Sequence, residues 1–185
     1  MEHQGTKTLE SDRLLLRRFR TEDAQAMYGN WAGDLEVTKY LRWPHHADVE
    51  ASKSIIDDWV SHYEENDFYN WAIVLKESGM PVGSIGVVQK DDAVKMVHIG
   101  YCIGKKWWGQ GITAEALKML RSYFFNEVGV NRIEARHDPE NPNSGKVMVK
   151  CGFRYEGTQR EADWNNQGIC DASYYAVLAK DFEIA

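Results

Sequence analysis

Two glycines at the start of an expected helix make residues 107–115 a candidate phosphate-binding site. This segment reads WWGQGITAE, and its glycines are Gly109 and Gly111. A glycine has no Cβ, so the backbone can come close to a ligand. The first N–H groups of a helix have no partner within the helix, and the positive end of the helix dipole lies behind them. Because this combination binds phosphate, the segment predicts a site for a phosphate-bearing cofactor.

The spacing of these glycines narrows the class of cofactor. It lacks the Gly-x-Gly-x-x-Gly pattern of dinucleotide folds and the Gly-Lys-Ser/Thr ending of a P-loop, so NAD and nucleoside triphosphates are disfavoured. One structural alternative stays open, in which the glycines form a tight turn that only lets a helix and a strand pack closely.

The segments around this loop have the patterns of a strand and a helix. Residues 97–103 are rich in β-branched and aromatic side chains, and apolar residues at three- and four-residue spacing predict a helix over residues 113–126. Other strands are expected at residues 13–17, 71–75, 82–88, 132–136, 153–157 and 173–178. Other helices are expected to end near residues 31, 41, 63 and 151, with Thr21, Asp48 and Asn141 as N-caps of the first, third and fourth. The order predicts an α/β fold with a mixed sheet of about seven strands and helices on both faces.

Composition excludes several classes of protein. The 185 residues are 43% hydrophobic and 27% charged, which suits a single globular domain over residues 1–185. No apolar run reaches the roughly 20 residues of a membrane span, and the first residues lack a signal-peptide pattern, so we expect a cytoplasmic protein without a membrane partner. A net charge of −6 argues against nucleic-acid binding. The three cysteines and six histidines show no metal-ligand spacing, so neither a metal nor a disulfide is expected.

Three segments carry a resemblance to a known family. They are residues 10–17 (ESDRLLLR), residues 99–116 around the glycine loop, and residues 141–144 (NPNS) followed by residues 150–157 (KCGFRYEG). With Gly168, Asp171 and Tyr175 they extend over nearly the whole chain. The chain resembles the GNAT superfamily of acetyl-CoA-dependent N-acetyltransferases, and within it the branch of ribosomal-protein N-terminal acetyltransferases. The resemblance implies the GNAT fold, in which the central sheet is mostly antiparallel.

The resemblance also implies how acetyl-CoA is bound. The loop would cradle the pyrophosphate, the backbone of a strand would pair with the pantetheine amides as an added strand does, and two residues of the NPNS segment would reach the cofactor. Trp108 stands where many members have Arg or Gln, and Thr113 where Gly or Ala is common. The implied cofactor-binding residues are Tyr101, Cys102, Ile103, Trp108, Gly109, Gln110, Gly111, Ile112, Thr113, Ala114, Asn141 and Ser144.

The family transfers the acetyl group directly within a ternary complex, and this chemistry needs a base. An amine is largely protonated at neutral pH, so a group must accept its proton, directly or through water. His98 is the first candidate, since it stands where this branch often has Glu; the alternative is a hydrogen-bonded residue of the sheet. Glu134, on the adjoining strand, is the second, unless its side chain points to the opposite face.

Ser144 resembles the family serine whose hydroxyl donates to the leaving thiolate. Many members have a Tyr one turn further along, where this chain has Met148. This makes Ser144 the stronger candidate for the group that assists the leaving thiolate. The alternative is an ordinary serine in the first turn of a helix. Asn141 is expected both to cap that helix and to contact the cofactor. A backbone N–H near residues 99–101 is expected to hold the oxyanion.

The acceptor is expected to be a primary amine, either of a protein N-terminal residue or of a small molecule. Four aromatic residues fall in segments that wall the acceptor site in similar proteins, although core packing is the ordinary role of any one of them: Trp31, Tyr40, Trp43 and Tyr69. By analogy, an exposed edge strand near the C-terminus suggests a homodimer. A non-catalytic acyl-CoA-binding sensor is the alternative function.

Overall fold

Eight strands form one sheet within residues 1–182, the part of the chain that the computed structural model describes. The strand order is β1-β2-β3-β4-β5-β6-β8-β7, and all neighbours are antiparallel except β5 and β6. The strands are β1 (Leu9–Glu10), β2 (Leu14–Arg17), β3 (Asn70–Leu75), β4 (Met80–Asp91), β5 (Met96–Ile103), β6 (Arg132–His137), β7 (Arg154–Asn165) and β8 (Gly168–Leu178). The expected mixed, mostly antiparallel sheet is confirmed, and the short β1 makes one strand more than the expected seven.

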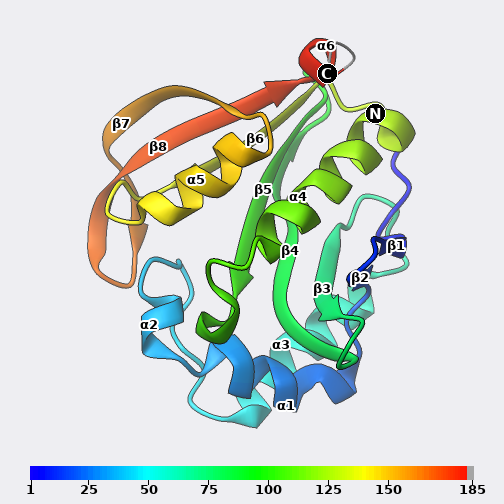
Figure 1. The fold of residues 1–185 in the computed structure, drawn as a ribbon, viewed down its shortest axis with the longest axis vertical. Coiled ribbons are helices and arrows are strands. Elements are labelled where there is room, and N and C mark those ends of the chain that lie inside the picture. The colour runs from blue at the N-terminus through cyan, green and yellow to red at the C-terminus, as the bar shows by residue number, and fades with distance from the viewer. Residues whose placement is uncertain (183–185) are drawn as a thin grey trace.

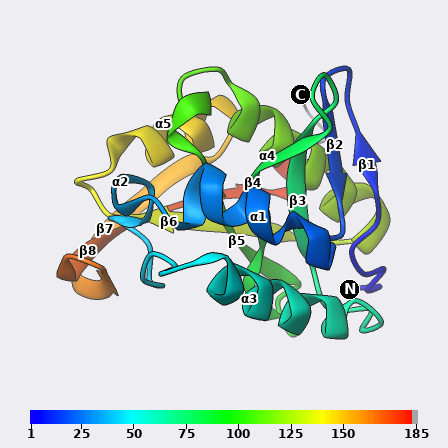
Figure 2. The ribbon, with the colours of Figure 1, turned by 90° about the horizontal axis from the view of Figure 1, so that it is seen from below.

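Helices cover both faces of the sheet, as expected. Viewed from below, α4 and α5 lie over one face and α3 lies over the other (Figure 2), and α4 and α5 diverge in front of β5 in Figure 1. We call these the α4–α5 face and the α3 face. The helices are α1 (Ala24–Met27), α2 (Leu35–Thr38), α3 (Val49–His62), α4 (Ile112–Tyr123), α5 (Pro142–Lys150) and α6 (Ala179–Phe182). None of the helices in the described part is long and apolar enough to cross a membrane.

Alternation along the strands builds one apolar core on each face. Leu14, Leu16 and Ile73 point to the α4–α5 face, where they join Leu117 and Leu120 of α4. Their strand neighbours point the other way, and Ala72 and Val74 pack with Phe19, Trp31 and Ile56 on the α3 face. The period of two in the strands and the three- to four-residue spacing in the helices therefore bury complementary surfaces.

Of the three side chains expected to cap helices, only that of Asp48 does so. The Asp48 side chain caps α3 by accepting a hydrogen bond from the amide of Ala51 at 2.8 Å. Thr21 is not a cap: it begins a 3-10 turn, and its hydroxyl donates to Asp57 at 2.7 Å. The expected helix to residue 31 is a 3-10 turn, the four-residue α1 and a π-helical turn (Tyr28–Ala32) in succession. The one expected near residues 36–41 is α2, which ends at Thr38.

The hairpin of β7 and β8 is much longer than the sequence indicates. Its β7 strand runs to Asn165, whereas the expected strand ends at residue 157. Most β7 side chains are exposed, so the strand has no apolar alternation by which to recognise it. Pairing with β8 stabilises it instead, with irregular register between Gln159 and Asp163.

The parallel pair of β5 and β6 separates after three residues. Register pairs join Met96 to Arg132 and His98 to Glu134, and none follows. From there β5 continues to Ile103 against β4 alone, while β6 continues against β8 alone. The sheet therefore opens between the two strands, and residues 99–103 have a free edge on this side.

Candidate active site

A cleft of about 1150 Å³ passes through the opening between β5 and β6. On the α4–α5 face its lining includes Tyr101, Thr113 and Ser144, and on the α3 face it includes His98 and Arg136. One continuous space thus reaches the proposed cofactor residues from one side of the sheet and the proposed base from the other.

The free edge of β5 can bind an extended chain through its backbone. Residues of an antiparallel strand direct their N–H and C=O groups alternately to one neighbour and to the other. The Gly104 N–H donates to Val82 of β4 at 2.9 Å, so the backbone groups of Tyr101 and Ile103 point into the opening. The Ile103 carbonyl already accepts a hydrogen bond from Trp108 Nε1 at 2.9 Å.

By the same alternation, the backbone of Cys102 is not available to the cofactor. The expectation that it pairs with the pantetheine amides is therefore wrong. Its backbone groups face β4, and its side chain is buried in the core of the α3 face. Burial raises the pKa of this thiol to about 12, so it is an apolar filler rather than a nucleophile. All three cysteines are free in this structure.

The loop before α4 presents a row of unpartnered amides. Gly109 has a φ of 74° and Gly111 a φ of 77°, a conformation that favours glycine. Within residues 1–182, the backbone N–H groups from Gly109 to Ala114 donate to no other group of the chain. These amides, with the helix dipole behind them, are free to hydrogen-bond an anion, and the anion site at the start of α4 stays a prediction.

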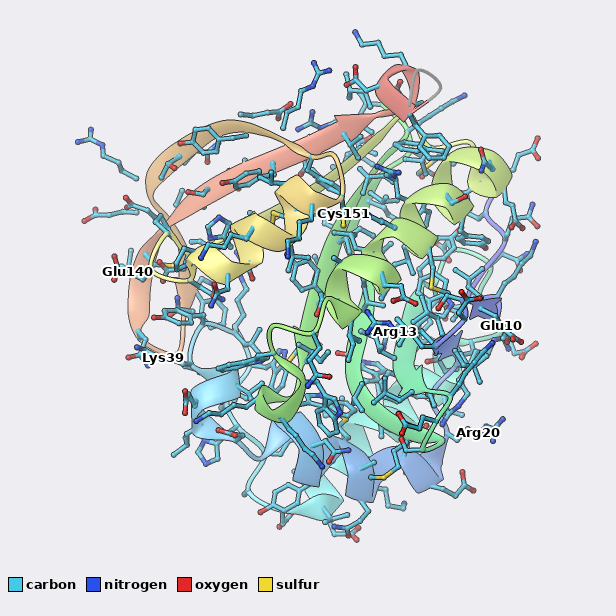
Figure 3. All side chains as sticks on the ribbon, in the orientation of Figure 1. Glu10, Arg13, Arg20, Lys39, Glu140 and Cys151 are labelled. Atoms are coloured by element: carbon cyan, nitrogen blue, oxygen red, sulfur yellow. The ribbon has the colours of Figure 1, made fainter. Side chains whose placement is uncertain are left out.

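A brace that sequence reasoning missed holds this loop from the other end of the chain. Glu115 of α4 accepts hydrogen bonds from Ser11 and from Arg13 Nε, both at 2.5 Å. Arg13 Nη2 also donates to the carbonyl of Gln110 at 3.1 Å. Figure 3 shows Arg13 beside the beginning of α4. The ESDR segment, which carried part of the resemblance, therefore fixes the loop conformation.

The start of α5 faces the free edge of β5. The Tyr101 hydroxyl donates to the backbone carbonyl of Ser144 at 2.9 Å, and burial raises the pKa of this hydroxyl above its ordinary value. Asn141 is the N-cap residue, but its side chain bonds no amide of the helix. Its Nδ2 donates instead to Ser144 Oγ at 3.4 Å. The Ser144 hydroxyl thus accepts one hydrogen bond and keeps its own hydrogen for another group.

His98 and Glu134 form a pair at the point where β5 and β6 separate. His98 Nδ1 lies 3.1 Å from Glu134 Oε1, and His98 is only 3% exposed. Glu134 lies on the α3 face with His98, because its neighbours Ile133 and Ala135 are buried on the other face. Glu134 therefore does not point to the opposite face, and it stays a candidate for the base.

Arg132 holds the second oxygen of this carboxylate. Its Nε and Nη2 donate to Glu134 Oε2 at 3.0 Å, and Arg132 also pairs with Glu156. The hydrogen bond with His98 lowers the pKa of Glu134 most, burial opposes it, and Arg132 lowers it further. Since the ionised carboxylate can only accept, Nδ1 of His98 is the donor. In the neutral ring, Nε2 then keeps its lone pair.

Two of the four expected acceptor aromatics line the cleft. Tyr40 and Trp43 do so, on the loop that follows α2. Trp31 does not line the cleft. It is fully buried in the core of the α3 face, where its ring centre lies 6.4 Å from that of Phe19. Tyr69 is also a core residue, whose hydroxyl accepts a hydrogen bond from the Gln4 amide at 3.2 Å. The sequence missed other lining residues, namely Trp59, Phe68, Arg136, Asp163 and Trp164.

Met148, which stands where many family members have a Tyr, is a core residue. Met148 is 1% exposed and packs in the core of the α4–α5 face. Among residues 1–182, no three His, Cys, Asp or Glu side chains are grouped as metal ligands would be.

A sequence model of the acetyltransferase (GNAT) domain matches residues 13–154. The chain belongs to the GNAT acetyltransferase family. It is an acyltransferase of the N-acetyltransferase type. The resemblance to this family and to its ribosomal-protein branch is thereby confirmed.

Relatives of this GNAT protein match it over most of their length. It is 31% identical over 176 residues to the uncharacterized N-acetyltransferase p20 of Bacillus licheniformis, covering 95% of this chain and 98% of that one. It is 33% identical over 163 residues to the ribosomal protein uS5-alanine N-acetyltransferase of Escherichia coli (strain K12), covering 83% and 81%. The solved structure of the microcin C7 self-immunity acetyltransferase MccE, in complex with acetyl-CoA and AMP, has the same fold, with a TM-score of 0.81, 23% identity, and 91% and 93% of the two chains covered.

Proposed function

We propose that this GNAT enzyme transfers the acetyl group of acetyl-CoA directly to a primary amine, of a protein N-terminal residue or of a small molecule. The observation that carries the proposal is the opening between β5 and β6. It joins a free strand edge and the unpartnered amides of α4 to the His98–Glu134 pair. Cofactor and acceptor can therefore meet from opposite faces of the sheet.

The residues present suit coenzyme A. A Cβ placed on Gly109 would meet no atom within 4 Å beyond its two chain neighbours, so the space beside this part of the loop is open to a ligand such as a diphosphate. The backbone of Tyr101 offers an N–H and a C=O to the pantetheine amides. Acetyl-CoA supplies the activated acetyl thioester. The family uses this co-substrate, and the MccE structure contains it.

Three groups of the chain then have separate roles. His98 Nε2 accepts the proton of the acceptor amine, while Glu134 holds the ring in this orientation and stabilises the imidazolium that forms. A backbone N–H of the free edge near Tyr101 hydrogen-bonds the oxyanion. Ser144 donates its hydroxyl hydrogen bond to the departing sulfur. The thiolate of coenzyme A then takes up a proton from solvent and the His98 imidazolium releases one to solvent. The products are the N-acetylated amine and the free thiol of coenzyme A, so atoms and charges balance.

Release of free thiol from acetyl-CoA tests this function. We expect turnover with one or more acceptors in a panel of peptides with N-terminal alanine or serine and of small amines, and a gain of one acetyl group in the acceptor by mass spectrometry. The uS5-alanine enzyme of E. coli motivates the peptide part of the panel. Binding of acetyl-CoA in calorimetry without turnover of any acceptor would instead support a non-catalytic sensor.

A further inference from the structure

Three charged side chains from three separate elements meet in the acceptor part of the cleft. Arg136 of β6 lies with its Nε 2.6 Å from Asp163 Oδ2 of β7. Arg42, on the loop between α2 and α3, donates from Nε to Asp163 Oδ1 at 2.8 Å. All three residues belong to the lining of the cleft. Two guanidinium groups thus share a single carboxylate.

Both oxygens of Asp163 already have donors, whereas each arginine keeps a guanidinium N–H group without a partner in the described part of the chain. Its Oδ1 also accepts the amide of Trp164 at 2.8 Å. Burial opposes its ionisation, but the hydrogen bonds from Arg42 and Trp164 and the charge of Arg136 outweigh this, and the pKa of Asp163 is lowered. Arg136 Nη1 donates to the Tyr174 hydroxyl at 3.2 Å. Within residues 1–182, Arg136 Nη2 and Arg42 Nη1 donate to nothing.

A purely structural role does not account for two arginines here. The loop that carries Arg42 is already tied to the β7–β8 hairpin by Asn166. The Asn166 amide donates to the Leu41 carbonyl at 3.1 Å, and its Nδ2 donates to the carbonyls of Trp43 and Thr38 at 2.8 and 2.9 Å. These uncharged hydrogen bonds hold the loop between α2 and α3 without any contribution from Arg136, which contacts the Asp163 carboxylate from the sheet.

The position of Arg136 sets the distance to the proposed base. Arg136 follows Glu134 by two residues on the same face of β6, a rise of roughly 7 Å. Glu134 holds His98, so the backbone positions that carry Arg136 and this pair lie about this far apart. A fully extended dipeptide spans roughly 7 Å. The aromatic rings of Trp43 and Trp164 line the same cleft, and Arg42 lies 5.7 Å from the Trp164 ring centre.

We propose that Arg42 and Arg136 bind an anionic group of the acceptor, about two residue lengths from the amine that is acetylated. This inference rests on the proposed function and narrows its substrate class. The anion could be the terminal carboxylate of a dipeptide-sized molecule or an acidic side chain near a protein N-terminus. Both present carboxylate oxygens to the free guanidinium N–H groups, for which Arg is well suited.

Asp138, another carboxylate of the cleft lining, lies just after the end of β6. Asp138 follows Arg136 by two residues, but its oxygens accept hydrogen bonds from Asn165 Nδ2 at 2.7 Å and from the Glu140 amide at 2.8 Å. These bonds turn it toward the β7–β8 hairpin and the start of α5. A preference of the enzyme for cationic acceptors would contradict this assignment and favour Asp138 and Asp163 as the recognition groups.

Matched acceptors test the proposal with the full-length enzyme. The first pair is alanyl-tyrosine and its C-terminal amide, and the second is the C-terminal amides of alanyl-aspartate and alanyl-asparagine. We expect kcat/KM for the carboxylate member of at least one pair to exceed its neutral partner by roughly tenfold or more, chiefly through KM. The first pair reports a terminal carboxylate and the second a side-chain carboxylate.

Variants connect the preference to the two arginines. R136Q and R42Q should each reduce the ratio within the preferred pair to about one, while activity on the neutral partner stays within about threefold of wild type. R154Q removes an exposed arginine paired with Asp181 outside the cleft and should keep the wild-type ratio. Thermal melting verifies that each variant is folded. If R136Q does not fold, the ratio measured for R42Q decides the test.

The outcomes separate this inference from the proposed function. Equal turnover of all four acceptors, preference for the C-terminal amide of alanyl-lysine, or an unchanged ratio in both variants overturns the anion site and leaves the acetyltransferase activity standing. No turnover of these or of any other amine overturns the proposed function, and this inference with it.

Discussion

His98 Nδ1 and Glu134 Oε1 lie 3.1 Å apart across the three-residue parallel contact of β5 and β6. Just beyond this contact the strands separate and the cleft begins. The pair therefore stands where the backbone pairing ends, with Arg132 fixing the second carboxylate oxygen at 3.0 Å. A histidine oriented by a carboxylate on one nitrogen presents the other nitrogen in a defined direction, which is what a base for the acceptor amine requires.

Replacement of His98 tests this assignment. H98Q should lower kcat by roughly 100-fold or more, the usual contribution of a positioned general base, with little change in acetyl-CoA affinity. Thiol release gives the rate and titration calorimetry gives the affinity. The matched control is H62Q, since His62 lies in the last turn of α3, outside the cleft. A kcat for H98Q within about threefold of wild type would remove His98 from the mechanism.

The same pair makes stability depend on pH in a defined direction. His98 first, and then Arg132, lower the pKa of folded Glu134 below its ordinary value of 4.5, against the effect of burial. A carboxyl group with a lowered folded pKa stabilises the protein above its unfolded pKa and loses this contribution as the pH falls through the folded value. The free energy of unfolding of wild type minus that of E134Q should therefore be constant near neutral pH and shrink below about pH 4.5.

Urea unfolding of both proteins at several pH values measures this difference. Carboxylates that do not contact Arg132 or His98 contribute equally to both proteins and cancel in the subtraction, and the variant E156Q measures the contribution of Glu156, which shares Arg132. A difference that is the same at pH 7 and well below pH 4 would show that the ionised form of Glu134 has no special stabilisation in the folded protein.

The parts of the site that follow from local sequence were predictable. Glycines before an amphipathic helix specify the amide cradle of α4, and Pro142 after Asn141 specifies the start of α5, because these signals act within a few residues. The brace of Arg13 and Glu115 was not predictable, since these residues are 102 positions apart. Only the fold brings the first strand beside α4.

The direction of a side chain was harder to predict than its element. Whether Glu134 faces His98 depends on the register of a parallel pair, and a shift of one residue would turn it to the other face. Trp31 and Tyr69 lie in the expected part of the chain, but both point into cores, as large aromatic side chains commonly do. The cleft-lining residues on β7 were missed because a polar, exposed strand has no apolar pattern.

Ser144 is expected to act on the leaving group rather than on binding. Asn141 donates to its Oγ at 3.4 Å, so the hydroxyl hydrogen is free for the thiolate sulfur. Loss of one hydrogen bond to a charged group costs about 1.5–3 kcal/mol, which corresponds to a fall in kcat of roughly 10- to 150-fold in S144A. KM for acetyl-CoA should change much less. The exposed Ser54 of α3 provides the control S54A, and equal kcat values for the two variants would dismiss the role of Ser144.

Gly109 and Gly79 form a matched pair that separates backbone strain from ligand binding. Their φ angles are 74° and 68°, and a Cβ on either would meet no protein atom within 4 Å. G109A and G79A should therefore lose a similar free energy of unfolding, about 1 kcal/mol, because alanine is disfavoured at positive φ. Gly79 lies in the turn between β3 and β4, whereas Gly109 lies beside the amides proposed to hold the diphosphate.

Only G109A should bind coenzyme A more weakly, since its new methyl group can clash with nothing except a ligand. We expect its dissociation constant to rise by roughly tenfold or more, while that of G79A stays at the wild-type value. Titration calorimetry with coenzyme A measures both constants. Because the two substitutions impose the same backbone strain, equal affinities would mean that the diphosphate does not approach the loop at Gly109.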